Sequence, residues 1–389
     1  MKILQIVPYF YPAWSYGGPA KLAYDTSIFF SEQGHQVTLY TSDAYDKESR
    51  MPKSLHINKK NLKVHYFKNF NNFLTYNYNI FFTPGLFLRA IFEVKKFDII
   101  HIHDFYTLQN FWVGILARIY GIPYIVSVHG CLEDKRMMQR SLFKKIFYNL
   151  YGLKLLKYAS RVIATSKNEV EAYKLHGIQK DKIILLGHGI DMLEFETKKT
   201  KSQCKEHFNL EKNQLVVTFL GRIHKIKGLN LLVEAISQIR NKLVTFVIAG
   251  SDDGYLSELE FLIKKFKISN RIKLLPACFG KEKSMLFKAS DIFVYPSYSE
   301  GFSLGILEAA ASGLPLLITT GCHFPLVAKA RAGIIVEPSY DVLKNGLNKL
   351  LDSANLRKEY GENAKRLVKE KYSMSYIGNT LLGIYEKLI

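Results

Sequence analysis

The chain has 389 residues, of which 48% are hydrophobic and 23% charged, so it is a folded protein too long for one ordinary core. Lysine and arginine outnumber aspartate and glutamate by 54 to 34, and the net charge of +20 calls for an anionic partner: a nucleic acid, an acidic membrane surface or an anionic substrate. No apolar run is long enough to span a bilayer, and the four cysteines lack the paired spacing of zinc or redox sites.

The start of the chain and the distribution of its basic residues bear on where the protein works. Residues 1–8 read as a strand ending at Pro8, with no basic leader and no cleavage site, so we predict no signal peptide and a cytoplasmic protein. The sequence shows no helix-turn-helix, zinc-finger or RNA-recognition signature, and its basic residues are spread among hydrophobic neighbours. This favours an anionic membrane surface over nucleic acid, and predicts a peripheral position on the inner membrane face.

The first half of the chain alternates strands and helices. A strand at 3–7, a loop ending Gly17-Gly18, a helix at 21–33 and a strand at 36–41 are typical of the start of a doubly wound sheet. Paired glycines let backbone approach a ligand closely, although a tight turn explains them equally well. They do not form the G-x-G-x-x-G fingerprint, which disfavours a nicotinamide cofactor. Further buried strands are expected at 98–103, 123–130, 161–166 and 183–186.

His129 stands at the carboxyl end of the strand at 123–130, just before Gly130. Ligands of α/β sheets bind at that end of the strands. A histidine in this place can be structural or functional, and the residues alone leave both readings open.

Two stretches of the first half combine basic and aromatic residues. Residues 53–97 are rich in phenylalanine, tyrosine and lysine, and some of these rings must belong to the core. Residues 135–161 carry eight basic residues and no acidic one, with apolar residues at helical spacing. This pattern predicts a basic amphipathic helix able to lie on an anionic bilayer, but a core-packed helix with a solvated basic face has the same pattern.

The second half repeats the alternation after a polar, lysine-rich stretch at 196–213, which we read as an interdomain linker. Strands are expected at 215–220, 246–250, 272–275 and 291–296, and helices at 229–241, 255–266 and 281–288. The sequence therefore predicts an α/β fold with two similar doubly wound layers and a cleft between them.

The segment 297–308 follows the last of these strands and enters a helix expected at 304–312. Glu300 lies on the turn and Glu308 lies about one turn into the helix, whose N-terminal N–H groups can hold anionic oxygens. Carboxylates beside a phosphate site are suited to accept hydrogen bonds from the hydroxyls of a ribose or a sugar. The segment therefore predicts a sugar nucleotide, although singly either acid can be an ordinary loop or helix-end residue.

Arg222 and Lys227 are cations at an earlier strand-to-helix junction. Arginine can grip a diphosphate with two hydrogen bonds, and lysine can bind it as a point charge. Each alone can be a surface charge. At the same sheet edge as Glu300, they become candidate phosphate ligands.

These residues resemble glycosyltransferase family 4, whose members are retaining enzymes of the GT-B fold with two Rossmann-like domains facing across a cleft. The family's Glu-x7-Glu motif is similar to residues 300–308, its phosphate clamp to Gly221-Arg222 and Lys227-Gly228, and its glycine loop to Gly17-Gly18. The resemblance covers nearly the whole chain. It implies an acceptor-binding domain at 1–195, the linker at 196–213, a donor-binding domain at 214–368, and a C-terminal helix at 369–389 that crosses back to the first domain.

The resemblance also implies roles for individual residues. Arg222 and Lys227 would bind the donor diphosphate and stabilise the leaving group, Glu308 would bind the ribose, Glu300 would hold the sugar, and His129 would lie beside the reacting face. The residue after the histidine is Gly130, where many members have aspartate, so its role is open. The implied catalytic residues are His129, Glu300, Arg222 and Lys227, and the implied donor-binding residues are Gly18, Arg222, Lys227, Gly250, Phe279, Glu300, Gly301, Phe302, Ser303, Leu304 and Glu308.

In the chemistry that the resemblance implies, the acceptor attacks the face from which the diphosphate leaves, and the departing phosphate takes the proton. No carboxylate nucleophile is then required. The sequence has no Asp-x-Asp site in a suitable context, so we predict a metal-independent hexosyltransferase without a cofactor.

The expected donor is a UDP- or GDP-linked sugar, and the expected acceptor is a saccharide or lipid-linked saccharide in cell-surface polysaccharide assembly. Two enzymatic alternatives remain for this fold, a sugar-nucleotide epimerase and a phosphorylase. A third alternative is a non-enzymatic basic protein that binds membrane or nucleic acid.

Overall fold

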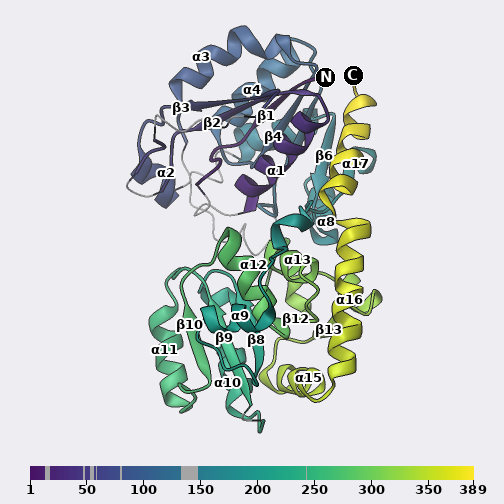
Figure 1. The fold of residues 1–389 in the computed structure, drawn as a ribbon. Coiled ribbons are helices and arrows are strands. Elements are labelled where there is room, and N and C mark those ends of the chain that lie inside the picture. Colours follow the sequence, from purple (N-terminus) through teal and green to yellow (C-terminus); the bar gives the residue numbers. More distant parts are fainter. Residues whose placement is uncertain are drawn as a thin grey trace. The chain divides into compact units, whose positions relative to one another are not determined.

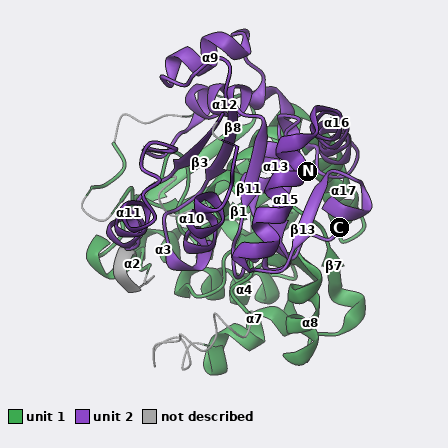
Figure 2. Cartoon of the chain, turned by 90° about the horizontal axis from the view of Figure 1, so that it is seen from below, with its two compact units in different colours: residues 1–189, 374–389 green, residues 190–373 purple. Residues whose placement is uncertain are grey.

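The computed structural model describes residues 1–13, 18–46, 49–52, 57, 59–78, 81–132, 148–241 and 243–389. The chain divides into two compact units (Figure 2). Unit 1 comprises Met1–Gly189 and Met374–Ile389, and unit 2 comprises Ile190–Ser373.

Unit 1 is built on a seven-stranded parallel sheet in the order β3-β2-β1-β4-β5-β6-β7. Figure 1 labels β1, β2, β3, β4 and β6 of this sheet. From β1 the chain moves outward in one direction to β3, then returns to the other side of β1 and continues to β7, which places the topological switch between β1 and β4. Ligands of open α/β sheets bind at the carboxyl ends of the strands at such a switch. The strands are β1 (Lys2–Ile6), β2 (Gln36–Ser42), β3 (Leu62–Phe67), β4 (Ile99–His103), β5 (Tyr124–Ser127), β6 (Arg161–Ala164) and β7 (Ile183–Leu185).

The C-terminal helix α17 (Met374–Glu386) belongs to unit 1 and packs against α1 (Gly18–Glu32). The fully buried Tyr385 ring meets Phe30 at 5.5 Å, and the Tyr385 hydroxyl lies 2.6 Å from His101 Nδ1. Gly378 permits the close approach, because a Cβ there would lie 2.3 Å from the Phe29 ring. The other described helices of unit 1 are α2 (Asn72–Tyr78), α3 (Pro84–Glu93), η2 (Val94–Lys96), α4 (Leu108–Ile119), η3 (Tyr148–Gly152), α7 (Leu153–Tyr158), α8 (Lys167–Leu175) and η4 (Lys180–Lys182).

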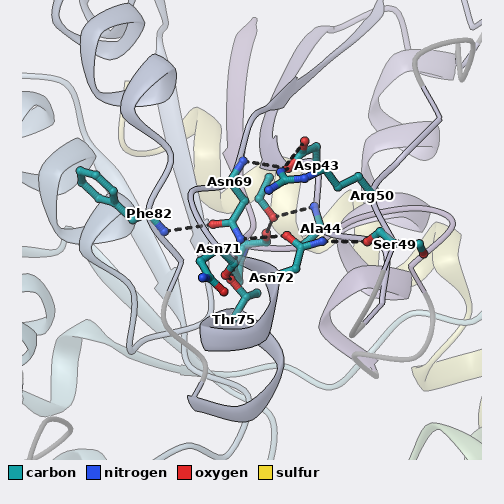
Figure 3. Close-up of polar contacts among 11 residues, drawn as sticks. Asp43, Ala44, Ser49, Arg50, Asn69, Asn71, Asn72, Thr75 and Phe82 are labelled. Carbon is teal, nitrogen blue, oxygen red and sulfur yellow. Dashed lines mark hydrogen bonds and ion pairs between the residues drawn. The ribbon is translucent and has the colours of Figure 1, made fainter.

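A fully buried asparagine, Asn69, joins the loops beside β2 and β3 (Figure 3). Its backbone N–H donates to Asp43 Oδ1 at 2.7 Å, and its amide nitrogen donates to Thr75 Oγ1 at 2.6 Å and to Asn72 Oδ1 at 3.2 Å. Its carbonyl oxygen accepts from the Phe82 N–H at 3.2 Å. Because every polar group of the amide is paired inside the protein, this network is structural.

Unit 2 is built on a six-stranded parallel sheet in the order β10-β9-β8-β11-β12-β13, with its switch between β8 and β11. The strands are β8 (Leu215–Leu220), β9 (Val244–Ala249), β10 (Ile272–Leu275), β11 (Ile292–Tyr295), β12 (Leu316–Thr319) and β13 (Gly333–Val336). The helices are η5 (Met192–Phe195), α9 (Lys201–His207), η6 (Lys225–Lys227), α10 (Leu229–Ser237), α11 (Leu256–Lys265), α12 (Gly280–Ala289), α13 (Leu304–Ala311), η7 (Thr320–Cys322), α14 (Leu326–Lys329), α15 (Tyr340–Asp352) and α16 (Ala354–Lys371).

Two parallel sheets flanked by helices confirm the predicted doubly wound α/β architecture. The stretch at 196–213, read as a linker from its polar composition, contains α9 and lies within unit 2. Thr200 and Gln203 form a capping box at the start of α9, and Cys204 and Phe208 are buried against residues of α12. The units meet in sequence at Gly189 and Ile190, and again at Ser373 and Met374.

Part of the predicted basic amphipathic helix, residues 135–147, lies outside the described residues, and the described remainder forms η3 and α7. Across the described ranges, no helix combines the length and the hydropathy that a bilayer span requires.

Candidate functional site

In unit 2, the loops after β8 and β11 are bound to each other at the carboxyl edge of the sheet. Gly228 has a φ of 66°, and a Cβ there would lie 2.0 Å from the Pro296 carbonyl oxygen, so only glycine fits. The Tyr298 N–H donates to the Ile226 carbonyl at 2.8 Å. This close approach brings Lys227, which ends the turn η6, beside the segment that follows β11.

Lys227 and Glu300 form a buried ion pair. Lys227 Nζ lies 2.6 Å from Glu300 Oε1, and the two side chains are only 9% and 7% exposed. Ser297 Oγ also lies 2.6 Å from that oxygen, and the Glu300 N–H donates to the Gly321 carbonyl at 2.8 Å. Burial acts to lower the pKa of Lys227, but Tyr295 and Glu300 outweigh it and raise the pKa above its usual value, so the lysine is a cation.

Glu308 lies on α13 and pairs with a second lysine. Lys283 Nζ, on α12, lies 2.8 Å from Glu308 Oε1, and the side chains are 17% and 6% exposed. The first turn of α13 packs against the end of β8, because a Cβ on Gly305 would lie 3.2 Å from the Leu220 carbonyl oxygen. The N-terminus of α13 therefore lies beside the residues that follow β8.

Arg222 is exposed at the same edge and pairs with Asp253 at 2.6 Å. The ends of β8 and β9 touch there, since a Cβ on Gly250 would lie 1.8 Å from the Gly221 carbonyl oxygen. Phe279 is the N-cap residue of α12, and its ring is 55% exposed. The structure thus places the predicted donor residues of unit 2 at one edge of one sheet.

In unit 1, His129 follows β5 and adopts a left-handed backbone with a φ of 52°, followed by Gly130 at 78°. The carboxylate of Glu169, at the start of α8, holds this turn by accepting from the Gly130 N–H at 2.6 Å and from the Thr165 N–H at 2.6 Å. Gly18 is the first residue of α1, and Gly17 lies outside the described residues.

Four histidines from three strand ends gather around this turn. His101 and His103 lie on β4 with ring centroids 4.1 Å apart, and the His129 ring lies 5.6 Å from both His103 and His188. Burial lowers the pKa of His101 to about 3 and that of His129 to about 4, and it lowers the pKa values of His103 and His188 as well. All four imidazoles are therefore neutral near pH 7.

The two halves of the chain each match a family of enzymes. The family of group 1 glycosyl transferases matches residues 201–367, and Glycosyltransferase Family 4 matches residues 16–192. The chain belongs to the family 4, group 1 glycosyltransferases.

Known proteins agree with this assignment. The uncharacterized glycosyltransferase MJ1607 of Methanocaldococcus jannaschii is 27% identical over 304 residues, which cover 76% of this glycosyltransferase and 77% of that protein. The D-inositol 3-phosphate glycosyltransferase of Gordonia bronchialis is 26% identical over 323 residues, covering 79% and 69%. The Anabaena protein Alr3699/HepE, solved in complex with UDP, superposes with a TM-score of 0.80 at 18% identity over the full length of both chains. The fold is GT-B, as the resemblance implied.

Three residues of this glycosyltransferase that sequence reasoning missed are Lys283, Glu169 and His103. Lys283 belongs to a helix rich in surface lysines, and its pairing with Glu308 depends on the packing of α12 against the rest of the unit. Glu169 reads as an ordinary first-turn acid of α8. The position of His103 could have been recognised from the sequence. It is the last residue of the buried strand β4, and His129 follows the adjacent strand β5. The carboxyl ends of neighbouring parallel strands lie at the same edge of a sheet.

Proposed function

We propose that this glycosyltransferase transfers a hexose, with retention of configuration, from a UDP- or GDP-linked donor to a saccharide or lipid-linked saccharide in cell-surface polysaccharide assembly. The observation that carries the proposal is the buried Lys227–Glu300 pair beside the N-terminus of α13. A cation, a carboxylate and the N–H groups of a helix N-terminus in one place suit a ligand with both phosphates and hydroxyls.

In this proposal Lys227 and Arg222 bind the diphosphate, and they oppose the negative charge that grows on it as the bond to the sugar breaks. Glu300 and the backbone at 301–304 hold the sugar, and Glu308 accepts from the ribose hydroxyls. We also propose that His129 and Gly18, both of unit 1, contact substrate. The base lies near Gly250 and Phe279, whose exposed ring offers a stacking surface.

UDP is the favoured carrier. The Anabaena Alr3699/HepE structures include complexes with UDP and with UDP-glucose, and that protein shares this fold over the full length of both chains. A thermal-shift screen of UDP- and GDP-linked sugars measures this directly, since a ligand at about 100 times its Kd stabilises by about 2.7 kcal/mol. Stabilisation by GDP-sugars alone would reverse the preference.

The decisive experiment compares two lysines of one turn. Lys227→Met removes the buried cation, and Lys225→Met removes an exposed cation two positions earlier with the same change in charge. Release of nucleoside diphosphate that depends on added acceptor should be lost in Lys227→Met and kept in Lys225→Met. Equal rates in the two variants would refute the donor site, and release without acceptor would favour hydrolysis or epimerisation.

We further propose that transfer needs no metal ion, because the proposed roles of Arg222 and Lys227 would already supply two cations to the leaving group. Activity should survive a chelator. Loss of activity in the chelator that a divalent ion restores would overturn this part of the proposal.

We also propose that unit 1 meets an anionic membrane, where a lipid-linked acceptor would be found. Large apolar side chains are exposed around α2 and α3, including Phe70 at 72%, Phe73 at 57%, Leu88 at 64% and Phe92 at 66%. Together with the net charge of +20, they suit an interface that is both apolar and anionic. The protein should therefore bind anionic liposomes more strongly than neutral ones at low salt, and equal weak binding to both would contradict the proposal.

A further inference from the structure

A chain of hydrogen bonds runs through the core of unit 1 and ends at His129. It begins at the Leu22 carbonyl, which can only accept, and Thr26 Oγ1 lies 2.8 Å from it. The same oxygen lies 3.3 Å from the Ala23 carbonyl, 3.4 Å from the amide nitrogen of Gln5 and 3.5 Å from Gln5 Oε1. The single hydroxyl proton goes to the Leu22 carbonyl, which is the nearest of these acceptors, so toward Gln5 the Thr26 hydroxyl can only accept, from the amide nitrogen. Gln5 and Thr26 are both fully buried. In the opposite orientation Gln5 Oε1 would face Thr26, whose proton is already used, so the favoured orientation directs Oε1 toward His103.

The oriented amide then sets the tautomer of His103. Gln5 Oε1 lies 3.1 Å from His103 Nε2, and an amide oxygen only accepts, so Nε2 carries the proton. Burial lowers the pKa of His103, so the ring is neutral and its Nδ1 has a bare lone pair.

The next hydrogen bond, between His103 and His129, fixes the tautomer of His129 in the same way. His103 Nδ1 lies 3.4 Å from His129 Nε2, which must therefore be the donor. The rings are inclined by only 3°, and their centroids are 5.6 Å apart, longer than the nitrogen–nitrogen distance by about two ring radii. The two imidazoles therefore meet edge to edge, as a hydrogen bond requires. The separation is long for such a bond, as is common at sites without substrate.

His129 Nδ1 is the end of the chain. It is shielded from solvent, and none of the described residues gives it a hydrogen-bond partner. With Nε2 protonated and the ring neutral, Nδ1 can only accept a hydrogen bond.

We propose that Gln5 and His103 are positioning residues that hold His129 as its Nε2–H tautomer, so that Nδ1 is an acceptor reserved for a hydroxyl of the substrate. The use of this acceptor on a substrate rests on the proposed transferase function, whereas the tautomer itself does not. A hydrogen-bond acceptor at this position favours a substrate hydroxyl over a carbonyl or phosphate oxygen, because those oxygens have no proton to donate. A sugar that lacks the matching hydroxyl would leave a buried polar group unpaired.

The neighbouring histidine supplies a matched control. His101 packs on His103 but has its own partners, the Tyr385 hydroxyl at 2.6 Å and Ser127 Oγ at 2.8 Å. Tyr385→Phe removes a buried hydrogen bond in the same cluster without touching the chain that leads to His129.

Nitrogen-15 spectra of the full chain labelled at histidine test the tautomer without substrate. His129 is assigned from the spectrum that His129→Asn changes. The wild-type protein should show His129 protonated at Nε2 and bare at Nδ1. A proton on Nδ1 would overturn the proposal even if the protein transfers sugar, and the expected tautomer in a protein without transferase activity would refute only the proposed function.

Variants of Gln5 test the direction of the chain. Gln5→Met removes the acceptor and should let His129 populate the Nδ1–H tautomer, with a loss in kcat/KM of about tenfold or more, as for lost outer partners of other functional histidines. Gln5→Glu keeps an acceptor and should keep the tautomer, and Tyr385→Phe should change neither tautomer nor kcat/KM. If Gln5→Met does not fold, Thr26→Val cuts the chain one step earlier. An unchanged His129 tautomer in the folded variant would refute the proposal.

Discussion

Acid should unfold unit 1 through its histidine cluster. His101, His103, His129 and His188 are buried, and burial lowers the pKa of each below the ordinary value of 6.5. Above pH 6.5 the rings are neutral in the folded and unfolded chains alike, so they do not affect stability. Below pH 6.5 these histidines bind protons in the unfolded chain but not in the folded chain. The free energy of unfolding therefore decreases as pH falls toward the pKa values of the folded state.

The size of the loss follows from the pKa values. His101 and His129, with pKa values of about 3 and about 4, remain neutral in the folded protein at pH 5. Each then lowers the free energy of unfolding by about 2 kcal/mol relative to pH 7, from about 1.36 kcal/mol for each pH unit below the unfolded pKa. Their sum of about 4 kcal/mol is a large share of the roughly 5–15 kcal/mol that stabilises a domain.

Urea unfolding followed by tryptophan fluorescence measures this loss selectively. Both tryptophans, Trp14 and Trp112, lie in the sequence range of unit 1 and none lies in that of unit 2, so the signal reports on unit 1. His103 and His188 add to the loss of about 4 kcal/mol from His101 and His129, so the urea midpoint should fall by about 2 M or more between pH 7 and pH 5 for an m-value near 2 kcal/mol/M. His101→Gln removes one titrating ring and should shrink the pH difference by about 2 kcal/mol. A midpoint that does not move with pH, or a difference that the variant leaves unchanged, would show that the cluster does not control acid stability.

Three further predictions concern packing and charge. Lys227→Met should lower the free energy of unfolding of unit 2 by about 3–5 kcal/mol, because Glu300 is left as a buried unpaired charge. Adding Glu300→Gln should restore stability but not activity. Urea unfolding followed by circular dichroism measures the stability of both variants, and full stability of the single variant would count against burial of the pair. Gly228→Ala should lower the melting temperature, because its Cβ would lie 2.0 Å from a carbonyl oxygen, and an unchanged temperature would mean that the turn can shift. Truncation after Ser373 removes α17 and should lower the urea midpoint of the tryptophan signal, and a midpoint equal to that of the full chain would show that α17 adds nothing to unit 1.

The sheets of both units were predictable because parallel strands buried on both faces leave continuous apolar runs. The strand at 98–103, for example, corresponds to the fully buried β4. The stretch at 196–213 was predicted to be a linker, because its many lysines and few large apolar residues give no clear signal for the short helix α9. That helix is stabilised by a capping box and by one buried face, and neither gives a strong periodic signal over so few residues.

The residue types of the site were predictable, but their pairing was not. Glu300 and Lys227 are far apart in sequence, and their contact depends on the close approach of Gly228 to Pro296. The partner of Glu308, Lys283, comes from a different βα unit. Sequence patterns locate strand ends, but they do not say which charges on neighbouring loops neutralise each other.

Backbone conformation gives an independent indication that the strand ends of unit 1 are built for function. Asp104 and His129 follow the adjacent strands β4 and β5, and both have a positive φ, of 72° and 52°. Such a conformation costs about 1–3 kcal/mol in a residue other than glycine. The other described non-glycine residues with positive φ lie in turns beside helices or just before a strand: Asn61, Asn209, Lys267, His323 and Arg331.

At those other positions the left-handed turn ends a helix or reverses the chain, so the fold itself requires it. No helix ends at Asp104 or His129. The turn at His129 is kept by hydrogen bonds that substitution would remove, from the Gly130 and Thr165 N–H groups to Glu169 and from the His129 ring to His103. Buried polar contacts maintain this strained conformation, and the same contacts fix the direction in which the His129 ring points. The conformation is therefore better explained by the need to position His129 Nδ1 than by a contribution to the stability of the fold.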